Sequence, residues 1–411
     1  MLPMKGLPSM RWKKEWTGFL LLVLSLRVLY GAIGVWVVRS GGPIPLQEPV
    51  YAEMKPYLQT GVLSENLINP WFQWDTISFL KIAILGYERD ATVAFMPLYP
   101  LAIRWGGAIL GGRYLLAALL VSTLCAFLTL VMMFELFRKQ FTEEIAWQAV
   151  LIFLSFPTAF YLLAGYTESL FLGLVLAFWI LAENRWWGWA GLVAGLATLT
   201  RFQGMILSIM LLWMMLSTVW SREKRLPLVN FDSWVEALCT LPGRVFRAVP
   251  PAAWLAVLVP PVVAFSYQFW LAYSGYGTLV QAYAQFWHME TVPPWIGVMR
   301  ILQQLPTWDF LYIDWIDLFL LIVVAFAAVL APRRLSSAFS LYIWLTLAVF
   351  FSRWTPHFLL GSFSRYFLTL FPLALLPALS NNRYLRVTVI VLFFALHIVL
   401  VTIFLWGSWV S

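Results

Sequence analysis

Repeated apolar runs of 16 to 23 residues are the feature that most constrains how this chain can fold. Roughly 20 apolar residues in a helix cross the hydrocarbon core of a bilayer, whereas the strands of a membrane barrel would alternate between polar and apolar residues. The composition agrees, because 62% of the 411 residues are hydrophobic and only 11% are charged, against roughly 25% charged in soluble proteins. We therefore predict an all-α polytopic membrane protein.

Short basic loops orient the predicted helices, because lysine and arginine favour the cytoplasmic side. A basic N-terminal cluster precedes an apolar run at 17–38, which we interpret as an uncleaved first span. Residues 39–93 hold four basic and six acidic residues, which fits an external loop. About eleven spans, within a range of ten to thirteen, place every basic cluster in the cytoplasm; they are 17–38, 114–137, 145–163, 167–182, 186–200, 203–220, 252–273, 315–331, 336–352, 364–379 and 384–406.

The whole chain, 1–411, is predicted to form one integral membrane domain with two large external segments. The first, 39–113, includes residues 96–111, which prolines and glycines interrupt and which we expect to lie in the interface without crossing. The second, 274–313, is rich in aromatic residues and prolines. Such a composition favours helices in the headgroup layer, and we predict a lid over the external face.

Several function classes find no support. The net charge of +8 resides in short loops that orient helices, so it predicts no nucleic-acid partner. The chain has no dinucleotide fingerprint, phosphate-binding P-loop or HExxH pair. Cys125 and Cys239 suit neither a disulfide nor a metal site. With three histidines a histidine-rich metal centre is not expected; a carboxylate-bound divalent ion stays open but is not indicated, and no cofactor is predicted.

Asp75 is the first candidate catalytic residue. It follows Trp74 in a predicted interfacial helix and has Trp71, Phe72 and Phe79 nearby. An acidic residue in such surroundings is poorly solvated, which raises its pKa toward a range useful to a general base. The alternative is a carboxylate that caps the start of a helix or contacts headgroups.

The other unusual polar residues also gather at the external ends of the predicted spans. Glu168 lies between two apolar spans, where a carboxylate costs roughly 2.5–3.5 kcal/mol and needs a partner or a task; the alternative is a first-turn glutamate favoured by the helix dipole. Arg201 and Arg365 each lie near such an end, and the planar guanidinium group of arginine suits binding of a phosphate. The alternative for Arg201 is a side chain that extends along apolar surface to place its charge at the interface. His357 alone is a weak candidate, and Gln203 adjoins Arg201.

Topology adds an argument for an anion. The spans that begin near Glu168, Gln203 and Arg365 all run inward, so their N-termini point outward. Helix N-termini present free N–H groups and a positive dipole end, both of which favour anions. Together with the two arginines they predict an external phosphate site, and a phosphate so close to the bilayer suggests a lipid.

At these motifs the sequence resembles the PIG-V family, mannosyltransferases that act on glycosylphosphatidylinositol anchors, and its prokaryotic relatives. The likeness covers about residues 70–210. It is carried by Trp74-Asp75, Phe79-Leu80, Ile82-Ala83, Gly86-Tyr87, Ala94-Phe95-Met96-Pro97, Pro100, Phe156-Pro157, the stretch from Ala164 to Phe171 and the stretch from Thr200 to Gly204. Arg365-Tyr366, followed by Pro372, resembles a late Arg-Tyr motif of GT-C glycosyltransferases more broadly. The chain departs from the family at Phe202-Gln203 and at Thr92-Val93.

The resemblance implies a GT-C fold and an inverting enzyme that takes mannose from a polyprenyl-phosphate donor and passes it to a glycolipid or glycan. Asp75 would be the general base, Glu168 would orient the sugar or the acceptor, and Arg201 and Arg365 would hold the lipid phosphate. The predicted site comprises catalytic Asp75 and Glu168, with substrate-binding Trp74, Lys81, Tyr166, Arg201, Gln203, His357, Arg365 and Tyr366.

Two other readings of the sequence stay open. A transporter or flippase of lipid-linked sugars would also be polytopic and bind phosphate, but transporters usually place charge near the membrane midplane, where only Arg27 lies here. A GT-C enzyme could also use another sugar or a protein acceptor. We expect a multi-pass protein with an external or luminal site, in the plasma membrane of a prokaryote or the endoplasmic reticulum of a eukaryote. The sequence assigns no role to Glu88-Arg89-Asp90.

Overall fold

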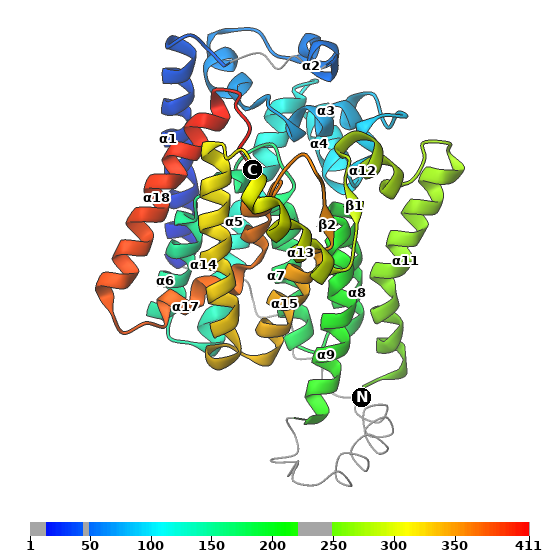
Figure 1. The fold of residues 1–411 in the computed structure, drawn as a ribbon, viewed down its shortest axis with the longest axis vertical. Helices are drawn as coiled ribbons and strands as arrows, with labels where there is room; N and C mark the ends of the chain where they lie inside the picture. Colours follow the sequence, from blue (N-terminus) through cyan, green and yellow to red (C-terminus); the bar gives the residue numbers. More distant parts are fainter. Residues whose placement is uncertain (1–13, 44–48, 221–248, 411) are drawn as a thin grey trace.

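The computed structural model describes residues 14–43, 49–220 and 249–410. Five of its helices are long and apolar enough to cross a membrane, and each coincides with a predicted span (Figure 1). They are α1 (Lys14–Arg39), α5 (Tyr114–Gln140), α11 (Pro251–Tyr273), α14 (Tyr312–Arg334) and α18 (Arg383–Leu405). The basic residues predicted in the cytoplasm at 222–225, most of the N-terminal cluster and Cys239 lie outside the described residues.

Shorter apolar helices occupy most of the other predicted spans. These helices are α6 (Glu143–Ser155), α7 (Glu168–Glu183), α8 (Trp187–Thr200), α9 (Ile206–Trp220) and α15 (Ser337–Phe351). At 364–379 the structure differs from the predicted continuous span: α16 (Phe363–Tyr366), two 3-10 turns and α17 (Leu375–Ala378) follow one another. Pro372 and Pro377 supply no backbone N–H, so they interrupt a continuous helix there. The total of eleven spans and the GT-C fold stay predictions.

Small residues bring the central helices together. Figure 1 shows α7 and α8 inside the bundle, with α11 at its edge. A Cβ atom on Gly191 of α8 would lie 2.6 Å from the backbone oxygen of Ala256 on α11, and one on Gly195 would lie 2.9 Å from Val259. Membrane helices pack closely where such small residues face a neighbour. This interface therefore depends on glycine at both positions.

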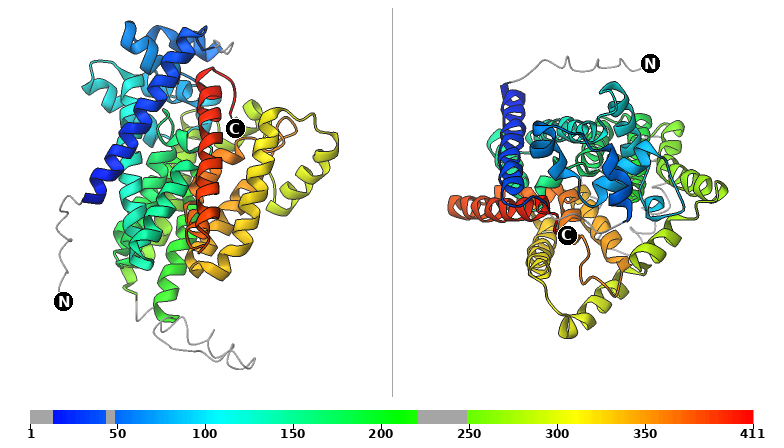
Figure 2. Two further views of the ribbon diagram at one scale, coloured as in Figure 1. Left: turned by 90° about the vertical axis from the view of Figure 1, so that its left-hand side faces the viewer. Right: turned by 90° about the horizontal axis from the view of Figure 1, so that it is seen from above.

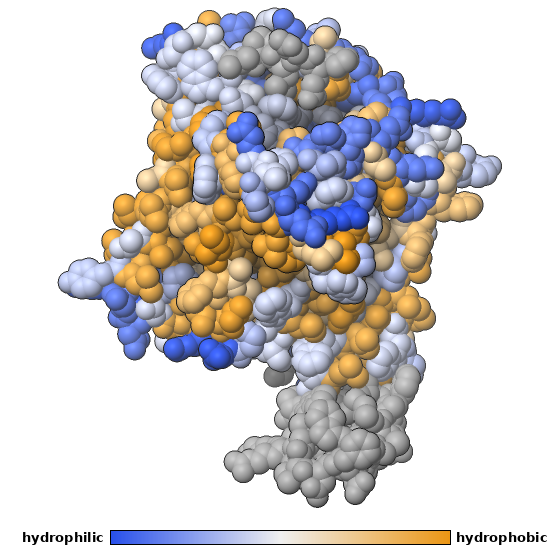
Figure 3. Space-filling view, in the orientation of Figure 1, coloured by the Kyte–Doolittle hydropathy of each residue, from blue (hydrophilic) through white to orange (hydrophobic). Residues whose placement is uncertain are grey.

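The surface pattern agrees with a membrane protein. In Figure 3 a hydrophobic band crosses the middle of the face in view, and hydrophilic residues gather above it. Large apolar side chains on the long helices are exposed, including Val28, Val262, Ile322 and Phe326. In water such exposure would be unfavourable, whereas lipid tails are as apolar as these side chains.

One end of the bundle carries the short helices of the predicted first external loop: α2 (Pro49–Met54), α3 (Asp75–Ile84) and α4 (Leu98–Ile109) (Figure 1). The 12 residues of α4 extend about 18 Å. That 96–111 lies in the interface without crossing the membrane stays a prediction.

The second predicted external segment lies beside this end. It contains α12 (Leu279–Trp287), β1 (Glu290–Thr291) and α13 (Pro294–Gln304), and it runs along one edge of the bundle (Figure 2). β1 pairs antiparallel with β2 (Arg353–Trp354), so that Thr291 is opposite Arg353. A Cβ atom on Gly297 of α13 would lie 1.9 Å from the backbone oxygen of Phe351. The segment is therefore held to the chain just after α15.

Candidate active site

Asp75 begins α3 at a turn with unusual backbone geometry. Trp74, the residue before the helix, has φ of 51° and ψ of −125°. Positive φ is uncommon in a non-glycine residue and persists only where the surroundings impose it. Here the Trp74 indole donates to the backbone oxygen of Ser408 (3.3 Å) and packs edge-on against Trp409. These contacts fix the start of α3 and with it the position of the Asp75 carboxylate.

Asp75 begins a chain of four alternating charges. Arg365 donates from Nη1 to Oδ2 of Asp75 (2.6 Å), and its Nε lies 3.2 Å from Oε1 of Glu168. Arg201 donates from Nη1 to the same Glu168 oxygen (2.6 Å). The Glu168 side chain is 1% exposed and the Asp75 side chain is 17% exposed. This row of charged side chains therefore extends from the protein interior to a more open end at Asp75. Charges this buried are retained when they are paired and hydrogen-bonded.

The segments that carry these charges meet through local contacts. Thr158, upstream of α7, donates to the backbone oxygen of Ser364, the residue before Arg365 (2.8 Å). A Cβ atom on Gly165 would lie 2.8 Å from Cγ2 of Thr76, so only glycine lets α3 approach the start of α7. Glu168 is the first residue of α7 and Asp75 of α3. Both carboxylates therefore lie at helix N-termini, where negative charge is favoured.

Aromatic rings surround the guanidinium groups. The guanidinium carbon of Arg365 lies 5.3 Å from the ring centre of Tyr166, 5.6 Å from that of Tyr161 and 5.0 Å from that of Tyr366. Aromatic faces attract cations, especially where water is excluded. Tyr161 and Tyr166 are buried in the bundle. The rings therefore surround the buried cations, whereas the Asp75 side chain is 17% exposed.

The structure thus brings together most of the predicted site residues. Trp74, Asp75, Tyr166, Glu168, Arg201, Arg365 and Tyr366 form one cluster. Gln203 is 8% exposed, and its Nε2 has no hydrogen-bond partner among the described residues. His357 lies apart on the exposed surface, with its ring 4.8 Å from that of His288.

Lys81 belongs to a second cluster, in the predicted first external loop. Its Nζ lies 2.8 Å from carboxylate oxygens of Glu53, Glu88 and Asp90. Burial opposes the charge on Lys81, but its hydrogen bonds to Asp90, Glu53 and Glu88 outweigh burial and raise its pKa. The same contacts lower the pKa of Asp90 against the effect of its burial. Within the charged corner, Glu88 and Asp90 therefore have a structural task, which is to bind Lys81.

Replacement of Lys81 by methionine is expected to destabilise this loop, because three carboxylates would lose their common cation. A fully buried pair broken this way costs about 3–5 kcal/mol; the acids here are 32–52% exposed, so we expect less. Thermal unfolding and proteolysis of the purified protein measure the effect, with exposed Lys55→Met as the control. Equal stability of both variants would contradict the structural role.

The same pairs predict the pH range over which the loop is stable. The pKa of Asp90 is lowered on folding, so its contribution is present above the ordinary aspartate pKa of about 3.9 and is lost as pH falls through the folded value. The pKa of Lys81 is raised, so its contribution is complete below about pH 10.4 and is lost only at higher pH.

Sequence reasoning missed three residues at the main cluster. Arg353 donates to the Tyr366 hydroxyl (3.3 Å), Tyr161 faces Arg365, and Asp317 of α14 is 4% exposed. An acidic residue inside an apolar run was the available signal for Asp317. No signal distinguished Arg353 from other arginines in loops. Among the described residues no group of three or more histidine, cysteine, aspartate or glutamate side chains could hold a metal ion.

The Mannosyltransferase (PIG-V) family matches residues 34–233, a range that includes Asp75, Glu168 and Arg201. The chain is similar to the PIG-V mannosyltransferases. GPI alpha-1,6-mannosyltransferase 2 of Cricetulus griseus is 30% identical over 158 residues, which cover 35% of this chain and 31% of the relative. The protein of the same name from Rattus norvegicus is 31% identical over 158 residues, which also cover 35% of this chain and 31% of the relative. The matched region thus spans about a third of these relatives.

The predicted resemblance to the PIG-V mannosyltransferases is confirmed. No solved structure matches the chain at a significant level. The family match ends before Arg353, Arg365 and Tyr366, although the structure places these residues against the matched part. Their functions are therefore argued from geometry alone.

Proposed function

We propose that the protein transfers mannose from a polyprenyl-phosphate donor to a lipid-linked or cell-envelope glycan acceptor at the external face of the membrane. The observation that carries the proposal is the buried charge chain Asp75–Arg365–Glu168–Arg201, at the end of the bundle covered by the external loops. It combines a partly exposed carboxylate with guanidinium groups, as proton abstraction beside a phosphate requires.

Asp75 acts as the general base. Its Oδ2 accepts from Arg365, whereas Oδ1 makes no hydrogen bond with any described residue and is the oxygen that receives the acceptor proton. The acceptor oxygen then attacks the anomeric carbon from the side opposite the phosphate, and the bond from that carbon to the phosphate oxygen breaks. The lipid phosphate leaves with the bonding electrons, and the new glycosidic bond has inverted configuration. Glu168 keeps Arg365 and Arg201 in place.

An apolar pocket supports a lipid-borne donor. It has a cavity volume of about 120 Å³ and lies between α6, α14, α18 and the broken helix after Tyr366. Its lining is entirely apolar and includes Phe367 and Leu368, which directly follow Tyr366 in the chain. An isoprenoid chain in this pocket would have its phosphate end close to Arg365, because burial of apolar surface holds the chain on that side.

The position of the basic residues supports an external site. α14 ends with Arg333 and Arg334, and α18 begins with Arg383 and contains Arg386. These ends lie opposite α3 in the bundle (Figure 1). Since basic loops favour the cytoplasm, Asp75 is on the other side.

The test uses the purified full chain in lipid vesicles with polyprenyl-phosphate mannose labelled in the sugar, and a membrane lipid extract as acceptor. We expect label to move into a new glycolipid of opposite anomeric configuration, with release of polyprenyl phosphate. GDP-mannose in place of the lipid donor is the control and is expected to give no product. Transfer from GDP-mannose alone, or passage of unchanged donor across the vesicle membrane, would contradict the proposal.

A further inference from the structure

Three guanidinium groups surround the ring of Tyr366. The guanidinium carbons of Arg353, Arg201 and Arg365 lie 4.3 Å, 4.6 Å and 5.0 Å from the ring centre. Arg353 and Arg365 both donate to the Tyr366 hydroxyl, at 3.3 Å and 3.2 Å. Tyr366 therefore connects Arg353 directly to the charge chain that ends at Asp75.

Arg353 differs from the other two arginines in its partners. Arg201 and Arg365 pair with carboxylates, whereas Arg353 forms no ion pair with any residue in the described ranges. Its Nε is buried and has no hydrogen-bond partner among those residues. A buried donor left unsatisfied is costly, and native proteins rarely keep one without a purpose. This geometry leaves a guanidinium edge ready for an acceptor that the chain itself does not supply.

The balance of charge in the cluster indicates that this hydrogen-bond acceptor is negatively charged. Three guanidinium groups face only two carboxylates, Asp75 and Glu168, in a site largely shielded from water. An unpaired cation in such surroundings is unfavourable, and one negative charge would compensate it. Tyr283 of α12 also faces the cluster; burial, followed by the proximity of Tyr366, raises its pKa, so it stays a neutral donor.

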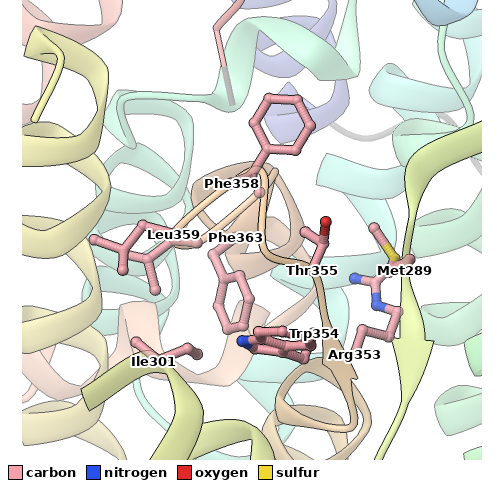
Figure 4. A pocket seen from close by; sticks show the side chains of 10 residues that line it. Met289, Ile301, Arg353, Trp354, Thr355, Phe358, Leu359 and Phe363 are labelled. Atoms are coloured by element: carbon pink, nitrogen blue, oxygen red, sulfur yellow. The ribbon is translucent and has the colours of Figure 1, made fainter. Parts of the chain in front are cut away.

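A partly open pocket lies beside Arg353. Arg353 lines this pocket at the junction of α13, β2 and the turn at 355–361 (Figure 4). In that view Arg353 lies opposite Ile301, with Trp354 between them. The pocket also contains Thr355, whose hydroxyl donates to the backbone oxygen of Trp287 (3.2 Å). A planar guanidinium edge beside an open pocket suits a tetrahedral anion, which it can bind through two parallel hydrogen bonds.

We propose that Arg353 is a substrate-binding residue whose guanidinium holds a phosphate monoanion in this pocket, next to Tyr366. The inference deepens the proposed function and rests on it in naming the phosphate as that of the isoprenoid donor. It also changes the task of Arg201 and Arg365, which hold Glu168 and Asp75 while Arg353 supplies the free charge. Loss of Arg353 should therefore weaken phosphate binding and leave the ion pairs of the chain intact.

The experiment measures binding of farnesyl phosphate to the purified full chain by calorimetry. We expect Arg353→Gln to weaken binding about tenfold to a hundredfold, since hydrogen bonds to charged groups are worth about 1.5–3 kcal/mol. Arg353→Lys should restore part of the affinity, because it keeps the charge but not the fork. Arg300→Gln is the matched control: Arg300 also stacks on a pocket residue, Trp354, but pairs with Glu290.

Three ligands separate the possible sources of the anion. Farnesol has the chain without the charge and should bind weakly to every variant. Inorganic phosphate has the charge without the chain. If it competes with farnesyl phosphate in the wild type but not in Arg353→Gln, the anion site is supported. Tighter binding of farnesyl phosphate than of inorganic phosphate assigns the site to a lipid phosphate. Thermal unfolding of each variant identifies loss of fold. Unchanged binding by a folded Arg353→Gln protein, or no binding by the wild type, would overturn the inference.

The two proposals fail separately. Binding of farnesyl phosphate requires no sugar and no acceptor, so it can depend on Arg353 even in a protein that transfers no mannose. Such a result would refute the proposed function and leave the anion site. If Arg353→Gln transfers mannose at the wild-type rate and with the wild-type KM for the donor, the proposed function would stand and the role of Arg353 in phosphate binding would be refuted.

Discussion

Asp75→Asn is expected to lower the rate of mannose transfer by about 10²–10⁴-fold, the usual contribution of a positioned general base. The amide keeps the size of the side chain and can still accept from Arg365, but it cannot take the acceptor proton. The loss should therefore appear in kcat, with little change in the KM for the donor. Steady-state kinetics with polyprenyl-phosphate mannose measure both quantities.

Controls separate this catalytic loss from a loss of fold. The same substitution also removes the charge paired with Arg365 at 2.6 Å, so thermal unfolding and farnesyl phosphate binding are measured for the same preparation. Asp309→Asn changes an exposed aspartate of the external segment and should be neutral. Asp75→Glu should recover part of the activity because it restores a base. Transfer by Asp75→Asn within a few-fold of the wild type would remove Asp75 from the mechanism.

Glu168→Gln is expected to have the largest effect on stability. Glu168 is 1% exposed and is shared by Arg201 and Arg365, so its neutralisation leaves two guanidinium groups close together with only Asp75 as counter-charge. Removal of one member of a buried pair costs about 3–5 kcal/mol. We expect a large fall in thermal stability, together with loss of transfer because Arg365 no longer holds its place beside Asp75.

A double-mutant cycle with Arg201 tests this explanation. If Glu168 mainly compensates Arg201, then Arg201→Gln in the Glu168→Gln background should recover part of the lost stability. Glu183→Gln, at the other end of the same helix and exposed, serves as the matched control. Full stability of Glu168→Gln, or additive losses in the double variant, would contradict a shared buried charge.

The sequence predicted which residues meet better than it predicted what they do there. Asp75, Glu168 and Arg365 are far apart in the chain, yet their places at the outer ends of predicted spans indicated one site. Topology provides that information, because spans that alternate in direction bring their outer ends to one membrane face. The pairing of Arg365 with Asp75 depends on side-chain distances that the spacing of residues does not encode.

The residues whose partners lie in loops or in distant segments were the hardest to interpret. Lys81 was predicted to bind substrate, but it contacts three carboxylates of its own loop, and the sequence did not show how that loop folds back onto Lys81. Arg353 follows an apolar helix as many interfacial arginines do, so only the missing carboxylate in the folded structure distinguishes it. The broken helix at 364–379 looked continuous because hydropathy does not register where prolines interrupt it.

The short pairing of β1 with β2 has a consequence for the timing of the reaction. Thr291 is opposite Arg353, and Val292 donates to the backbone oxygen of Ser352 (2.8 Å), so α13 and the Arg353 strand share a backbone ladder. An outward swing of α13 would draw Arg353 away from Tyr366. The contact between Arg353 and the donor phosphate would then form in the same step as the return of α13, after the donor has bound. While α13 is swung outward, water could reach a bound donor, but the donor phosphate would lack its contact with Arg353 and would be a poor leaving group. The activated sugar would therefore be protected from hydrolysis between turnovers.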